Sequence, residues 1–176
     1  MQRRREGRFH PVCTGGELRT TLLSLCAGLA LSLPAHADRL PVPAEAPPSF
    51  KAECGGCHLP FPPALLTAAD WRRVMARLDE HYGDNAGLDE KTRREIEDFL
   101  QRHAASRSEL AGAGAPPRLT QTAWFQRKHR KVPLSVWRDP RVKSAANCAA
   151  CHTRAEAGSY RERELVVPGM TLWERD

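Results

Sequence analysis

Two segments of the chain place apolar side chains at helical spacing. The first is expected to form a helix that begins near Ala64 or Thr67 and ends at Tyr82, because one face is apolar and the other charged. The apolar face consists of Trp71, Val74, Leu78 and His81. Thr67 is a suitable N-cap for this helix, and Gly83 is placed to end it.

A second amphipathic helix is expected from about Asp89 to His103, with heavily charged positions outside its apolar stripe. This stripe consists of Ile96, Phe99, Leu100 and His103. Shorter helical stretches are expected at about residues 122–130 and 142–151, with prolines dividing the chain between them. There is no convincing strand pairing and no internal repeat, so the pattern predicts an all-α fold.

Residues 1–37 have the order of a secretory signal. Arginines are followed by an apolar run from Thr21 to Leu33 and then by the small-x-small sequence Ala35-His36-Ala37. The run is 13 residues long. A helix of that length spans roughly 20 Å, which is short for a bilayer, so an uncleaved anchor is the less favoured alternative. Cleavage after Ala37 would leave four cysteines and place the protein in the periplasm.

Two copies of the pattern C-x-x-C-H carry the chemistry of this chain. They are Cys54-Gly-Gly-Cys57-His58 and Cys148-Ala-Ala-Cys151-His152. Two thiols three positions apart can form thioethers with the two vinyl groups of one porphyrin, and the next residue then lies under the iron. The sequence therefore predicts two covalently bound haem c groups on the four cysteines, with His58 and His152 as iron ligands.

Two other uses of these cysteines are possible: a structural zinc site and a pair of disulfides. Zinc-binding cysteine pairs usually lie closer together than the 91 positions between Cys57 and Cys148. Neither use gives a reason for a histidine after both pairs. Haem is therefore preferred.

The occupant of the sixth position on each iron decides what a haem does. Two protein ligands suit an electron carrier, whereas an open position binds small molecules. His81 lies on the apolar face of the first helix, His103 equally continues the stripe of the second, and His129 lies in a basic run beside two aromatic residues. Met75 and Met170 are further candidates, although Met75 better suits packing. Spacing alone leaves the choice open.

The residues around both motifs carry a more specific pattern. After the first motif they are Phe61-Pro62-Pro63, Leu65-Leu66, Trp71, Met75, Leu78 and His81-Tyr82-Gly83. Around the second they are Trp124-Phe125, Lys128 to Pro133, Trp137, Ser144 to Asn147, Gly158-Ser159-Tyr160 and Val167-Pro168. Over nearly all of residues 50–168 the chain resembles the bacterial dihaem cytochrome c family, and it departs chiefly in the linker and the presequence.

This resemblance implies small periplasmic electron carriers with two covalent haems, each iron having two histidine ligands. The positions that match the family's sixth ligands are His81 for the first haem and His129 for the second, which disfavours His103. The resemblance also implies a first lobe like a helical cytochrome c domain and a less regular second lobe. The implied partners are other cytochromes and membrane redox proteins.

We therefore expect an all-α protein with two small lobes, each built around one haem. The expected segments are a signal peptide at 1–37, an extended lead-in at 38–49, a first haem lobe at 50–104, a Gly/Ala/Pro linker at 105–118, and a second haem lobe with an extended tail at 119–176. The expected function is outer-sphere electron transfer between redox proteins, without enzymatic activity. The alternative is a dihaem peroxidase or gas-binding cytochrome with an open or labile sixth position on the second haem.

Charge narrows the set of partners. The chain holds 27 Lys+Arg and 21 Asp+Glu, a formal net charge of +6, and part of this excess lies in residues 1–37. Haem propionates would lower the remaining charge, so nucleic acid is not an expected partner. The basic run Arg127–Lys131 is either a docking patch for an acidic protein or an ordinary solvated face. We expect a monomer with no small-molecule substrate.

Overall fold

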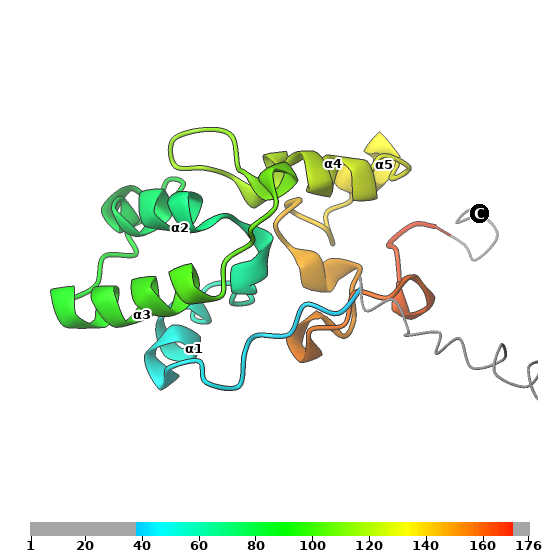
Figure 1. Ribbon diagram of the computed structural model, residues 1–176. Coiled ribbons are helices and arrows are strands. Elements are labelled where there is room, and N and C mark those ends of the chain that lie inside the picture. Colours follow the sequence, from blue (N-terminus) through cyan, green and yellow to red (C-terminus); the bar gives the residue numbers. More distant parts are fainter. Residues whose placement is uncertain (1–37, 171–176) are drawn as a thin grey trace, which may run out of the picture. The chain divides into compact units, whose positions relative to one another are not determined.

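The computed structural model describes residues 38–170, so the expected signal segment and residues 171–176 lie outside the described residues. Within this range the α-helices are α1 (Pro48–Cys54), α2 (Ala68–Met75), α3 (Glu90–Arg102), α4 (Ala123–Lys128) and α5 (Leu134–Trp137) (Figure 1). Short 3-10 turns lie between and after them, and pairing in the described chain is limited to isolated bridges. The prediction of an all-α fold is confirmed. No helix in this range is both long and apolar enough to cross a bilayer.

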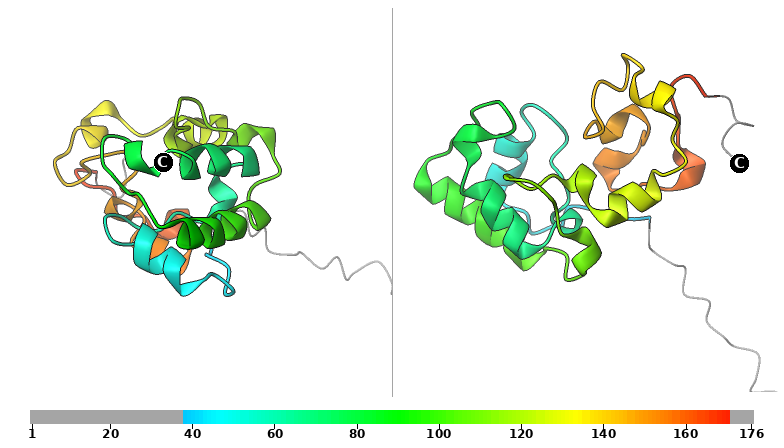
Figure 2. Two further views of the ribbon diagram at one scale, coloured as in Figure 1. Left: turned by 90° about the vertical axis from the view of Figure 1, so that its left-hand side faces the viewer. Right: turned by 90° about the horizontal axis from the view of Figure 1, so that it is seen from above.

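Helices α1, α2 and α3 enclose the main apolar core. Its buried members are Phe50, Leu66, Trp71, Val74, Met75, Ile96, Phe99 and Leu100. Helices α2 and α3 lie side by side in both Figure 1 and Figure 2. Ile96 and Phe99 are completely buried, as their place in the predicted stripe requires. The indole N–H of Trp71 donates to the carbonyl of Pro63 at 2.7 Å, which satisfies the one polar atom of this ring.

Helix α2 is shorter than the pattern predicts. Thr67 is its N-cap, as expected, but the helix ends at Met75 and is followed by a 3-10 turn at Leu78–Glu80. The prediction of a helix to Tyr82 was therefore wrong. A straight helix advances along one axis at about 1.5 Å per residue. The break instead turns the chain back, so that His81 lies in a loop facing the first C-x-x-C-H motif.

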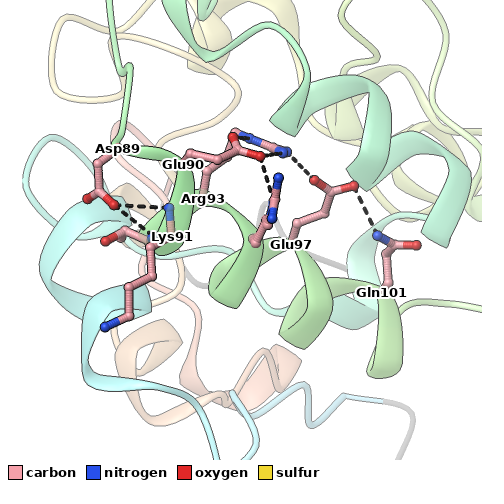
Figure 3. Close-up of polar contacts among 8 residues, drawn as sticks. Asp89, Glu90, Lys91, Arg93, Glu97 and Gln101 are labelled. Atoms are coloured by element: carbon pink, nitrogen blue, oxygen red, sulfur yellow. Dashed lines mark hydrogen bonds and ion pairs between the residues drawn. The ribbon is translucent and has the colours of Figure 1, made fainter.

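Helix α3 matches its prediction closely. Asp89 is the N-cap, and its carboxylate accepts hydrogen bonds at 3.0 and 3.1 Å from the amides two and three positions on. On the outer face Arg93 binds both Glu90 and Glu97, and Gln101 donates to Glu97 (Figure 3). Pairs of this kind contribute only a few tenths of a kcal/mol each. The network therefore adds little to the stability of the fold.

Several short elements differ from the sequence-based expectation. Helix α1, which ends on the first cysteine of its motif, and helix α5 were not predicted. The expected turns at 142–151 reduce to the 3-10 turn Cys148–Ala150. Helix α4 lies inside its predicted range of 122–130. Elements of one or two turns are too short to show a periodic pattern in the sequence. Their stability comes from tertiary packing.

The start of the described chain lies against the segment after the second motif. The amide of Leu40 donates to the carbonyl of Gly158 at 2.8 Å, and the amide of Tyr160 donates to Asp38 at 2.9 Å. Gly158 has a φ of 68°, and a Cβ atom there would lie 2.4 Å from the Cα of Pro41. Glycine is therefore required at this crossing.

Candidate haem sites

The first C-x-x-C-H motif begins at the last residue of α1. Cys54 is half-buried, whereas Cys57 and His58 are exposed. The Nδ1–H of His58 donates to the carbonyl of Leu59 at 2.8 Å, which leaves Nε2 as the nitrogen with a free lone pair. The ring of His81 faces this imidazole. The two ring centroids are 6.3 Å apart, and the ring planes are 16° from parallel.

At the second motif the paired histidine comes before the motif in the chain, whereas at the first motif it comes after. The histidine of the second motif, His152, follows the 3-10 turn Cys148–Ala150, and its partner His129 comes earlier, at the C-cap of α4. The Nδ1–H of His129 donates to the carbonyl of Phe125 at 2.9 Å. The ring centroids of His129 and His152 are 6.2 Å apart, but their planes are close to perpendicular, at 82°. The two pairs thus share a spacing and differ in ring orientation.

Aromatic side chains hold the second pair of imidazoles. Phe125 stacks on His129 with centroids 4.0 Å apart, and Trp137 lies 5.9 Å from the same ring. Tyr160 lies edge-on to His152 at 5.1 Å. The sequence did not single out Trp137 or Tyr160 as contacts of the histidines, because an isolated aromatic residue carries no signal of what it touches.

Burial favours the neutral form of His81, His152 and Cys54 by shifting the pKa of each group. It lowers the pKa of His81, with a further contribution from nearby His58, and it lowers the pKa of His152 to about 4, with a further contribution from His129. Burial also raises the pKa of the Cys54 thiol to about 11. Imidazole binds a metal in its neutral form. At neutral pH His81 and His152 are therefore already in the form that a metal requires.

The rival ligand candidates lie elsewhere. The Nε2 atom of His103 lies 3.3 Å from a carboxylate oxygen of Glu45, and its ring packs on Phe99. Met75 is 3 % exposed and belongs to the apolar core. No disulfide joins the four cysteines between residues 38 and 170, and no three His, Cys, Asp or Glu side chains in that range gather to hold a metal ion.

Comparison with known proteins identifies the family. The sequence model described as dihaem cytochrome c matches residues 50–160. The chain belongs to the dihaem cytochrome c family. A diheme cytochrome type c from Shewanella baltica is 38% identical, with a TM-score of 0.63 over 72% of this chain and 96% of that one. DHC from Rhodobacter sphaeroides is 40% identical, with a TM-score of 0.55 over 68% and 99%. A search of curated proteins gave no match.

A dihaem cytochrome c carries two covalently bound haem c groups, and the family implies electron transfer. The placement of the histidines fits these groups. Two imidazoles bound to one metal from opposite sides, with bonds of about 2 Å, have ring centres about 6 Å apart. Both pairs have this spacing, at 6.3 and 6.2 Å. The buried hydroxyl of Tyr160 beside His152 has no hydrogen-bond partner among the described residues, as expected beside a site that a further group fills.

Proposed function

We propose that this dihaem cytochrome c carries electrons between other redox proteins by outer-sphere transfer through two haems, each with two histidine ligands, and that it is not an enzyme. The observation that supports this is the facing of each motif histidine by a second imidazole, at centroid spacings of 6.3 and 6.2 Å. Haem supplies the one-electron chemistry. With both axial positions taken, a small molecule has no open position on the iron.

The roles of the residues follow from this proposal. The four cysteines attach the haems covalently: Cys54 and Cys57 hold the first, and Cys148 and Cys151 hold the second. His58 and His152 are the motif-side ligands. His81 and His129 occupy the sixth positions. Phe125 stacks on the ring of His129 and accepts a hydrogen bond from it through its backbone carbonyl. These contacts fix the imidazole of His129, which disfavours a labile ligand on the second haem.

We also propose that the protein works in the periplasm and meets other cytochromes or membrane redox proteins there. The order of residues 1–37 supports export. In the basic run, Arg127 pairs with Glu109 at 3.1 Å and Lys128 approaches Asp38 at 3.5 Å, so their charges are partly neutralised. Arg130 and Lys131 are exposed and carry the rest of the charge. Charge reversal at these two positions should slow reduction by an acidic partner and weaken its salt dependence.

The test of the function is a haem count and an optical spectrum. The full chain is produced with a haem-attachment system, and the reduced protein is measured before and after carbon monoxide. Two haems per chain and no spectral shift are the expected result. A shift on one haem would favour a gas-binding protein or peroxidase instead. Absence of haem would overturn the proposal, and N-terminal mass analysis of the same sample tests cleavage after Ala37.

A further inference from the structure

His81 differs from the other paired histidine that lies outside a C-x-x-C-H motif. The Nδ1–H of His129 donates to a backbone carbonyl, whereas the buried Nδ1 of His81 has no hydrogen-bond partner among the described residues. His81 also lies in a loop after a 3-10 turn, outside any helix. Its ring must therefore be held by packing and by the backbone on either side of it.

The next residue, Tyr82, makes the contacts that can do this. Its ring lies edge-on to that of His81, with centroids 4.7 Å apart. Its hydroxyl donates to the carbonyl of Pro117 at 2.5 Å, and the guanidinium of Arg118 lies 4.6 Å from its ring centroid. Tyr82 has a φ of 54°, a left-handed conformation that is unfavourable for a bulky residue and persists only where the surroundings hold it.

The segment that receives Tyr82 is itself fixed to helix α2. The backbone amide of Gly112 donates to the buried carboxylate of Asp70 at 2.9 Å. The guanidinium of Arg73 donates to the carbonyls of Gly112 and Gly114 at 3.2 and 3.3 Å, and it also pairs with Asp70. The hydroxyl of Tyr82 is therefore anchored to a held backbone.

We propose that Tyr82 is a positioning residue that retains His81 at the sixth position of the first haem, through its bond to Pro117 and its contact with Arg118. This proposal rests on the assignment of His81 as a ligand under the proposed function. The expected effect of losing these contacts is confined to the first haem. Loosening Tyr82 should make the first haem accessible to outside ligands and leave the second haem unchanged, because the bond of His129 to Phe125 does not involve this loop.

The experiment measures cyanide uptake by the oxidised holoprotein, followed in the Soret band. Tyr82→Phe removes the hydroxyl and keeps the ring. The loss of one hydrogen bond predicts uptake by one haem per chain about fivefold faster than in the wild type. Arg118→Gln should act in the same direction. His81→Ala, with its sixth position open, calibrates the rate and the amplitude for the first haem.

Two control variants separate positioning from general stability. Ile96→Val weakens the completely buried core of the same region without touching the loop. Tyr160→Phe removes a tyrosine hydroxyl beside the other haem's histidine. Both should take up cyanide at the first haem at the wild-type rate. A wild-type rate in Tyr82→Phe, or equal acceleration in Ile96→Val, would overturn the proposal. If His81→Ala itself takes up no cyanide, the assignment of His81 fails instead.

Discussion

The two hydrogen bonds of buried Thr122 allow the loss of stability on a single substitution to be worked out. Thr122 is 1 % exposed and is the N-cap of α4, the helix that leads to His129. Its hydroxyl donates to the carbonyl of Leu119 at 2.9 Å and accepts from the amide of Phe125 at 3.1 Å. Thr122→Val keeps the shape and removes both bonds. Loss of a cap costs about 1 kcal/mol. Loss of the buried bond to Leu119 costs about 1 kcal/mol more, although the carbonyl of Leu119 keeps the backbone amide of Thr122 as a donor at 3.2 Å.

The assay is a urea titration of the holoprotein followed by far-ultraviolet circular dichroism. Thr122→Val should lower the free energy of unfolding by about 2 kcal/mol, equivalent to a fall in Tm of roughly 5–10 °C. Thr122→Ser is the matched control, because it keeps both hydrogen bonds and loses one buried methyl group, at about 0.8 kcal/mol. If the valine variant proves as stable as the serine variant, the hydroxyl does not cap α4 in the way described.

Three further outcomes are expected. Gly158→Ala should destabilise the protein by about 2 kcal/mol or more, because it strains a positive φ and its Cβ would meet Pro41. A urea midpoint equal to that of the wild type would contradict this. Burial opposes ionisation of Asp70, but hydrogen bonds and a neighbouring guanidinium outweigh it and lower its pKa. This carboxylate therefore stabilises the fold above its ordinary pKa of 3.8 and loses that contribution as the pH falls through the lower folded value, so Asp70→Asn should flatten acid unfolding curves. Electron paramagnetic resonance of the oxidised protein should show two different low-spin signals, since one pair of imidazoles is nearly parallel, at 16°, and the other nearly perpendicular, at 82°; identical signals would contradict the ring geometry.

The helical stripes show where sequence periodicity succeeds and where it fails. The stripe of α3 is regular over 13 residues, so its bounds were predicted closely, and Ile96, Phe99 and Leu100 are buried as expected. The same reasoning extended α2 to Tyr82, because His81 continues its apolar spacing. The chain breaks after Met75 instead. Apolar spacing indicates that a side chain faces the interior, and His81, in a loop facing the first motif, is also partly buried.

The sequence by itself determined the attachment chemistry. Each C-x-x-C-H motif is five consecutive residues, so its two thiols and its histidine are near one another in any compact conformation, and two copies predict two haems. The family resemblance added the expectation that His81 and His129 complete the iron sites. Both lie 23 positions from a motif histidine, one after it and one before it.

Only the tertiary structure decided which uncommitted histidines face the motifs and how they are held. His103 continues the apolar stripe of α3 equally well, yet its Nε2 atom lies beside the carboxylate of Glu45. The angle between paired rings, the bond from Tyr82 to Pro117 and the stacking of Phe125 on His129 all depend on where the chain turns back. Those turns join residues far apart in sequence, and periodicity over a few helical turns carries no information about them.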